Sequence, residues 1–487
     1  MSAQTGKPSL RGDLRRIIPT TALALFGGLL TGVGAFTASR GNLSLMVYIT
    51  ALGGLAALAL AGSKPRLLLY GLILFLPVET IGPLSLMQSK VIKLALMLLL
   101  LGAEFARRSI RQDARWKRSP YDLFILVFLA SGTLSTILSR DPLSSARSVV
   151  QAALIFGFFA LIVNRVDNKQ TVVWLVKAML VVAVFVTVYG ILQKYFGYGP
   201  FGSAYIRQKI IAYYEIIGQR LFSVMNNPNA LGGYLGTMFP LALSMLLAKT
   251  RWYWRAGLTA FLAMMALVML WAGSRGALMG VAASAGVMLF LLRKNRVFVI
   301  VLAIILLLSL GGILYTYEQE TLSRYLRVND SLDVTLSGRW AIWETAVQIA
   351  KDHPVAGIGF YTWTTMYPEY GLSFWKTVDN PHNLLLNMAV EQGIPGVILY
   401  VWFVLLFLVT SFRFVRQTRR VSWAYPLMVG VLGAGISRIV HEIFEADTLL
   451  GVSSVAQVFW ALLALQIVAA RVARREQRLA QHDGGEA

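Results

Sequence analysis

The chain has 487 residues, of which 57% are hydrophobic and 14% charged, and it carries a formal net charge of +22. Apolar runs of about 18 to 22 residues recur along its length, and each can cross the ~30 Å of hydrocarbon in a bilayer. This composition excludes an ordinary soluble protein, and the lack of cysteine excludes disulfide bonds and thiolate chemistry. Unbroken apolar runs such as 94–102 and 297–308 lack the alternation of a membrane β-barrel. We therefore predict an all-α integral membrane protein.

The membrane spans are predicted from these runs in chain order. About fourteen are expected, within a multi-pass helical bundle of about 12–14 spans. They lie at about 18–36, 43–62, 66–82, 90–105, 121–139, 147–163, 171–193, 228–248, 256–273, 276–292, 297–316, 395–412, 423–440 and 450–470. The first run is too long for the apolar core of a cleavable signal peptide, so we expect it to be a retained span.

The basic residues gather in the loops of one side when these spans alternate from an inside N-terminus. The basic loops on that side are 64–66, 107–118, 165–169, 249–255, 293–296 and 413–420, together with both chain ends. Cytoplasmic loops of membrane proteins carry such an excess of Lys and Arg. The charge therefore indicates cytoplasmic N- and C-termini in a bacterial inner membrane rather than binding to nucleic acid.

Five segments follow from this topology. An N-terminal transmembrane bundle occupies 1–200, and a central transmembrane region with an outer loop occupies 201–316. A large helical outer loop with the candidate catalytic segment follows at 317–394. The C-terminal transmembrane helices cover 395–472, and a short basic cytoplasmic tail covers 473–487.

Arg275 lies in a tight turn on the outer side, in the sequence WAGSRGALMG at 271–280. An arginine at the end of a span can simply extend to the lipid headgroups. Gly273 and Gly276, however, permit close approach of another backbone or a ligand. A guanidinium held there is a good bidentate donor to phosphate.

A second candidate is Arg339, in the sequence SGRWAIWETAVQIAKDHP at 337–354. Ser337 is expected to cap a helix, which places Arg339 in the first turn. A cation is disfavoured there unless an anion is present, so an anion site and a solvated surface arginine are equal alternatives at this position. Apolar residues at helical spacing predict a helix lying on the membrane surface. These residues are Trp340, Trp343, Val347 and Ala350.

Arg220 precedes a span that opens with polar residues. Asn227, Pro228 and Asn229 form a favourable helix start, and this structural role is the simpler interpretation. Arg220 is retained as a third candidate for substrate contact.

His382 is one of only four histidines and follows Pro381 after the longest polar stretch. We expect Pro381 to start a short helix that ends at Gly393–Gly396, before the next long span. His382 then lies in its first turn, with Asn383 beside it, at the outer membrane surface. A neutral imidazole there can accept a proton, although a lone histidine is more often structural.

A cluster of ionisable residues ends the thirteenth span, in the sequence SRIVHEIFEAD at 437–447. Arg438, His441 and Glu442 are possible secondary site residues, with Glu445 and Asp447 nearby. Ionisable groups at membrane depth are costly and often functional, but an internal network of ion pairs is an equal alternative. The sequence contains no HExxH, Walker A or His/Cys metal spacing, so we expect no metal and no cofactor.

Taken together, these motifs resemble the O-antigen ligase and polymerase superfamily of bacterial envelope glycosyltransferases. His382-Asn383, nine further residues and Gly393–Gly396 match the family's H-N-x9-G-x-x-G pattern. The Ser-Arg-Gly turn at 274–276, the Arg-Trp pair at 339–340 and the Asn-Pro-Asn start are similar to it as well. The resemblance is strongest from about 218 to 412, and it implies a GT-C-like membrane bundle.

By this resemblance, the substrate is a glycan on undecaprenyl diphosphate, and the site faces the periplasm. His382 would act as general base on an acceptor hydroxyl, and Arg275, Arg339 and Arg220 would hold the diphosphate. Transfer would be metal-independent and inverting. The favoured acceptor is lipid A–core, which makes the chain an O-antigen ligase, and the alternative is a polymerase that uses a second lipid-linked glycan.

A membrane transporter or flippase is the competing class. It predicts inverted repeats and charged residues near the middle of the membrane. The sequence shows no clear internal repeat, and its candidate residues gather at one surface. The transferase is therefore favoured.

Overall fold

The computed structural model describes most of the chain beyond residue 64. The described ranges are 65–80, 86–112, 115–196, 220–225, 227–248, 251–292, 331–370, 378–446 and 453–483, with isolated positions between them. The predicted spans at 18–36 and 43–62, and nearly all of the span at 297–316, lie outside these ranges. Within them the structure is helical and contains no strand. The predicted all-α fold is therefore confirmed.

Two compact units divide the chain. The first comprises Met1–Ile73 and Ile92–Trp116, and the second comprises Leu74–Val91 and Lys117–Ala487. Helices α3 (Pro65–Phe75) and α4 (Leu86–Arg111) supply most of the first unit's described part. Buried Glu104 of α4 pairs there with Arg107 and Arg108, at 2.6 and 2.9 Å.

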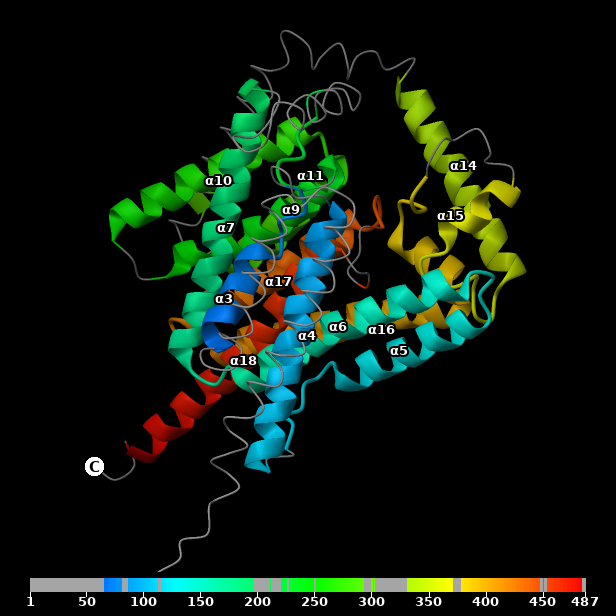
Figure 1. The fold of residues 1–487 in the computed structure, drawn as a ribbon. Helices are drawn as coiled ribbons and strands as arrows, with labels where there is room; N and C mark the ends of the chain where they lie inside the picture. The colour runs from blue at the N-terminus through cyan, green and yellow to red at the C-terminus, as the bar shows by residue number, and fades with distance from the viewer. Residues whose placement is uncertain are drawn as a thin grey trace, which may run out of the picture. The chain divides into compact units, whose positions relative to one another are not determined.

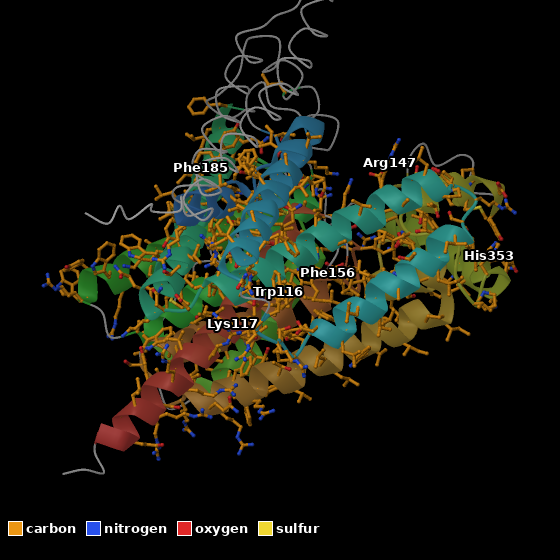
Figure 2. The ribbon with its side chains drawn as sticks, turned by 60° about the horizontal axis from the view of Figure 1, so that its bottom comes forward. Trp116, Lys117, Arg147, Phe156, Phe185 and His353 are labelled. Atoms are coloured by element: carbon orange, nitrogen blue, oxygen red, sulfur yellow. The ribbon has the colours of Figure 1, made fainter. Side chains whose placement is uncertain are left out.

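The second unit contains the remaining helices. They are α5 (Asp122–Ile137), α6 (Pro142–Arg165), α7 (Lys169–Phe196), α9 (Pro228–Ser244) with η1 (Met245–Leu247), α10 (Trp252–Ala272), α11 (Arg275–Leu292), α14 (Ser331–Asp352), α15 (Trp363–Met366), η3 (Tyr367–Tyr370), α16 (Leu384–Thr418), α17 (Ala424–His441) and α18 (Ser454–Asp483). Figure 1 shows α5, α6 and α16 running side by side. In Figure 2, Arg147 and Phe156 mark successive positions along α6, and His353 lies near the Arg147 end. Lys117 precedes α5, and its N–H donates to Asn164 Oδ1 near the other end of α6 at 2.7 Å.

Eight helices in the described ranges are long and apolar enough to cross a membrane. They begin at Pro142, Lys169, Pro228, Trp252, Arg275, Leu384, Ala424 and Ser454. Each coincides with a span predicted from the sequence, because a run of about 20 apolar residues forms a helix as long as the bilayer is thick. The chain is thus a multi-pass membrane protein.

Helix α9 lies in the interior of the second unit, packed against α10, α11 and α17. Asn227 caps its start by accepting from the Ala230 N–H at 2.7 Å, with Pro228 in the first helical position. This confirms the predicted helix start. Glycines allow the helices to approach closely, since a Cβ on Gly280 of α11 would lie only 2.3 Å from the Ser437 carbonyl oxygen of α17.

Helix α16 bends at the predicted G-x-x-G segment. Gly393 adopts φ +66°, a conformation that favours glycine, and Pro395 follows inside the helix. A Cβ on Gly393 would meet the Pro354 carbonyl oxygen at 2.4 Å, and the Ile394 N–H donates to that oxygen. The bend therefore docks the loop after α14 onto α16.

Two local expectations were wrong. Helix α14 starts at Ser331, so Ser337 is not its cap and Arg339 lies well inside the helix. A serine and a glycine weaken a helix by only about 1 kcal/mol each, and the longer helix tolerates that cost. Trp340 and Val347 of the predicted apolar face are exposed, and their contact with the membrane surface stays a prediction. The buried face of α14 is formed by Ile342, Ala346 and Ile349.

Candidate active site

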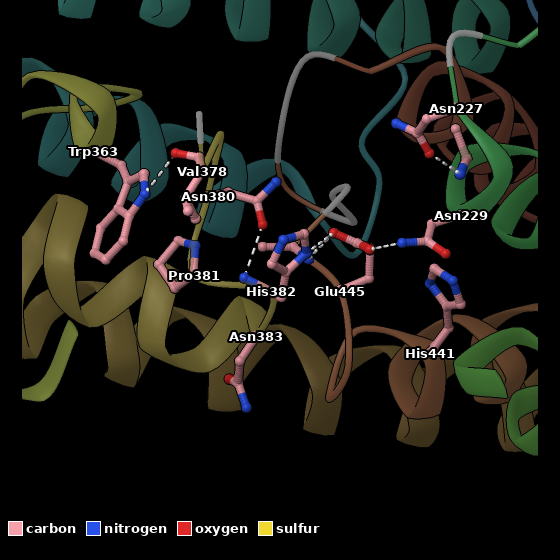
Figure 3. A network of polar contacts seen from close by, with 12 residues as sticks. Asn227, Asn229, Trp363, Val378, Asn380, Pro381, His382, Asn383, His441 and Glu445 are labelled. Carbon is pink, nitrogen blue, oxygen red and sulfur yellow. Dashed lines mark hydrogen bonds and ion pairs between the residues drawn. The ribbon is translucent and has the colours of Figure 1, made fainter. Parts of the chain in front are cut away.

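His382 lies two residues before the start of a helix, and not in the first turn that the sequence predicted. Helix α16 begins at Leu384, and Asn383 caps it by accepting from the Leu386 N–H at 3.1 Å. Pro381 therefore does not start the helix. His382 adopts φ +51°, which is uncommon for a residue with a side chain, and its N–H donates to Asn380 Oδ1 at 2.8 Å. The imidazole lies beside Glu445 (Figure 3).

Two neighbouring elements fix this turn. Trp343 of α14 donates from its indole nitrogen to the Pro381 carbonyl oxygen at 3.0 Å. From the other side, Asn383 Nδ2 donates to the Ile443 carbonyl oxygen, and the Leu384 N–H donates to the Glu442 carbonyl oxygen. The segment around His382 is thus held between α14 and the end of α17.

The imidazole of His382 pairs with Glu445. His382 Nδ1 lies 2.7 Å from Glu445 Oε1, and Asn229 Nδ2 donates to Glu445 Oε2 at 2.5 Å (Figure 3). Glu445 is 4% exposed, whereas the His382 side chain is 29% exposed. A buried carboxylate therefore orients an imidazole whose ring remains accessible.

Arg220 extends this network toward the turn that contains Arg275. Its Nη2 donates to Asn229 Oδ1 at 2.9 Å, and its Nε donates to the Ala272 carbonyl oxygen at 2.9 Å. The same guanidinium reaches the carbonyl oxygen of Gly273, whose φ is +64°. Arg220, Asn229, Glu445 and His382 thus form one continuous chain of polar contacts.

The charge state of Glu445 follows from its surroundings. Burial on its own raises the pKa of this carboxyl. The hydrogen bond with His382 and the electrostatic influence of His382, His441 and Arg339 outweigh burial, and they lower the pKa from 4.5 to about 2. Glu445 is therefore a carboxylate at neutral pH, and it can accept a hydrogen bond from a protonated His382 Nδ1.

Arg275 and Arg339 border the same region. Arg275 is exposed and begins α11, directly before Gly276, where a Cβ would lie 3.2 Å from Phe444 and 3.4 Å from the His441 carbonyl oxygen. Arg339 is partly buried on α14 and acts electrostatically on Glu445 and His441. Arg339 therefore acts directly on the His382–Glu445 pair, and Arg275 precedes a glycine that packs beside Phe444, the residue before Glu445.

The cluster Arg438, His441 and Glu442 lies deeper. Arg438 forms a buried ion pair with Glu442, and its Nη1 lies 3.4 Å from His441 Nδ1. It fills the space that Gly233 leaves open, since a Cβ there would meet Arg438 Nη1. The geometry of Arg438 and Glu442 fits the internal ion pair that the sequence left as an alternative.

Several contributors could not be assigned from the sequence. Asn229 was read only as part of a helix start, and Glu445 only as a member of an ionisable cluster, yet both contact the His382 network. Gln193 was not singled out. Its Oε1 accepts from the Phe222 and Ser223 N–H groups and so fixes the segment that carries Arg220. The amide's position at the end of a span was the available signal.

This arrangement can remove a proton from a bound hydroxyl. If Nδ1–H is donated to the Glu445 carboxylate, the lone pair of His382 remains on Nε2, where it can accept a proton. In the described part of the chain, no group of three or more His, Asp or Glu side chains is arranged to hold a metal ion.

Comparison with known protein families gives one match. A family model described as O-antigen ligase matches residues 260–401, which include Arg275, Arg339 and His382. No curated protein matches the chain. The match supports the superfamily that the motifs resemble.

Proposed function

Because that match supports an enzyme of the O-antigen ligase and polymerase type, we propose that the chain transfers a glycan from undecaprenyl diphosphate to an acceptor hydroxyl. The reaction takes place at the periplasmic face of a bacterial inner membrane. The favoured acceptor is lipid A–core, and the alternative is a second lipid-linked glycan. The observation that carries the proposal is the His382–Glu445 pair at 2.7 Å, with one partner buried and the other accessible.

His382 is the general base in this proposal. The acceptor oxygen attacks the anomeric carbon, and its proton moves to His382 Nε2 as the new glycosidic bond forms. The bond from that carbon to the diphosphate breaks, and the lipid diphosphate leaves with the electron pair. Glu445 stabilises the imidazolium that results. Attack opposite the leaving group inverts the anomeric configuration.

The arginines neutralise the diphosphate. Arg275 and Arg339 approach from α11 and α14, and a guanidinium offers paired donors to phosphate oxygens. Charge stabilisation of a leaving group by such fixed donors supplies several kcal/mol of barrier lowering, about 3 kcal/mol for one donor. We assign a positioning role to Arg220, because two of its nitrogens bind backbone carbonyl oxygens of the turn before Arg275.

The placement of these groups favours a transferase over a transporter. His382, Glu445 and Arg220 lie in the segments that connect helices, and Arg275 is the first residue of α11. A transporter would place its charged binding residues near the middle of the membrane. Ligase and polymerase share the chemistry, so only the acceptor separates them.

Reconstituted transfer tests the proposal. Purified chain, His382→Ala and the control His353→Ala would be supplied with a glycan on undecaprenyl diphosphate. Lipid A–core and a second donor molecule would serve as separate acceptors. Product on lipid A–core that His382→Ala reduces by about 10²- to 10⁴-fold supports the ligase and the base. His353 lies in the turn after α14 and is expected to be dispensable.

Other outcomes change the conclusion. A lengthened donor glycan, with no product on lipid A–core, identifies a polymerase. Full activity of His382→Ala removes this residue as the base. Absence of transfer to either acceptor, by folded chain that binds donor, contradicts the transferase.

A further inference from the structure

A cluster of arginines lies at the end of α16 that is remote from His382. Arg471 and Arg474 of α18 lie within electrostatic range of each other, and Arg413 of α16 and Arg478 of α18 act on Arg474. Arg474 also lies over the ring of Phe414, 5.5 Å from its centroid. Like charges from two helices therefore converge at one place.

Neighbouring helices join this end of the bundle. Arg471 Nη1 donates to the Val163 carbonyl oxygen near the end of α6 at 3.0 Å, and Gln477 Nε2 approaches the Gln417 carbonyl oxygen of α16 at 3.5 Å. These contacts hold α18 against α6 and α16, and they fix Arg471 in place. The arginine cluster is thus built on a packed junction and not on a free tail.

The charges in this cluster lack a carboxylate counterpart among the groups that act on them. Only other arginines act electrostatically on Arg471 and Arg474. Glu476, two residues after Arg474 on α18, accepts instead from the Trp423 indole at 2.8 Å. Arg471 Nη2 and Arg474 Nε are also shielded from water without a hydrogen-bond acceptor. Such donors are costly to leave unpaired, and an anion would offset that cost.

The depth of the cluster corresponds to the headgroup region. Arg471 lies about 25 Å along α18 from Ser454, and Arg413 lies about 30 Å along α16 from Gly393, at 1.5 Å per residue. These lengths approach the thickness of the hydrocarbon core. Val409 and Phe412 are exposed on α16 just before Arg413, where acyl chains would pass. Apolar surface beside a cluster of arginines favours a lipid over a free anion.

We propose that Arg413, Arg471, Arg474 and Arg478 bind the phosphate headgroup of an anionic phospholipid. Orientation of the chain requires basic residues on one side, but it does not require them to converge from two helices. Basic pockets between transmembrane helices recognise anionic lipid headgroups in this way. The site lies at the opposite end of α16 from His382 and is independent of the proposed transfer reaction.

Titration of short-chain phosphatidylglycerol into the detergent-solubilised full chain tests the site. Short-chain phosphatidylcholine and inorganic phosphate serve as parallel ligands. Saturable binding of phosphatidylglycerol is expected, and Arg471→Gln/Arg474→Gln should weaken it about 25-fold, at about fivefold per guanidinium. The control Arg475→Gln changes an exposed arginine of the same helix and should leave binding unchanged.

Three results would overturn the proposal. One is phosphatidylcholine that binds as tightly as phosphatidylglycerol. Another is a loss of phosphatidylglycerol binding in Arg475→Gln as large as that in the double variant. The third is inorganic phosphate that binds as tightly as the lipid and competes with it, which would make the site one for free phosphate. If the double variant does not fold, Arg413→Gln replaces it. This arginine is exposed, so its substitution should preserve the fold and weaken lipid binding about fivefold.

Discussion

The enclosed helices α9 and α17 differ from the peripheral helices α11 and α16. Protein surrounds 89% of the spanning segment of α9 and 78% of that of α17, against 33% for both α11 and α16. The enclosed pair carries glycines at its contacts and polar groups at its ends. The outer faces of the peripheral helices present large apolar side chains, such as Phe290 and Val409.

The difference shows where polar chemistry can be maintained in a membrane protein. A carboxylate such as Glu445 has to be surrounded by donors, and enclosed helix ends supply them from several elements. Lipid-facing surface offers no such partners. A substitution near α9 or α17 should therefore disturb backbone packing or a polar network and so lower stability or activity. A substitution on an outer face should change stability and activity little.

The largest expected effect comes from Glu445→Ala. Loss of the carboxylate frees the His382 ring and leaves Asn229 Nδ2 without its acceptor, so transfer should fall about 100-fold, mainly in kcat. The matched control is Glu369→Ala, which removes an exposed ion pair with Arg140 and should leave activity unchanged. Steady-state kinetics of both variants measure this. Equal losses in the two variants would contradict the orienting role of Glu445.

Gly280→Ala and Gly286→Ala compare the two sides of α11. The first adds a Cβ within 2.3 Å of the Ser437 carbonyl oxygen, whereas the second has no neighbour within 4 Å. Gly280→Ala should destabilise the fold by about 1–3 kcal/mol. Gly286→Ala should stabilise it by about 0.5–1 kcal/mol, because alanine favours the helix. Apparent melting temperatures in detergent report both, and similar values would refute the close α11–α17 contact.

A smaller effect is expected from Arg220→Gln. The shorter amide cannot span Ala272, Gly273 and Asn229 at once, so the turn before Arg275 loses its anchor. We expect about tenfold lower transfer, equivalent to ~1.4 kcal/mol. Arg251→Gln, which removes an exposed contact with the Tyr253 hydroxyl, is the control. A wild-type transfer rate for Arg220→Gln would show that this anchor plays no part in transfer.

The smallest expected effect is a pH dependence of stability. The pKa of Glu445 is lowered on folding, so its contribution is complete above its ordinary value of 4.5 and is lost as pH falls toward about 2. The melting temperature should therefore drop between pH 5 and pH 3. Glu445→Gln removes the titrating group and should flatten that part of the profile. An unchanged slope in this variant would show that other carboxyls cause the loss.

Local patterns predicted much of the fold and part of the site. The eight spans that the structure describes were found because apolar length is a local property, and Asn227 was recognised because helix capping involves residues three apart. The start of α14 was missed, since packing of Ile342 and Ala346 stabilises a helix that begins earlier than its capping signals indicate. The first turn assigned to His382 was wrong because Asn383, and not Pro381, begins the helix.

By itself, the sequence determined the membrane class, the positions of the eight spans that the structure describes and the resemblance carried by Arg275, Arg339 and His382. Hydrophobicity acts residue by residue along a helix, so these features need no knowledge of neighbours in space. Only the tertiary structure decided that His382 pairs with Glu445, 63 residues away, and that Asn229 reaches Glu445 across 216 residues. Such pairs depend on how α9, α16 and α17 pack, because a hydrogen bond requires two groups within about 3 Å in a defined direction.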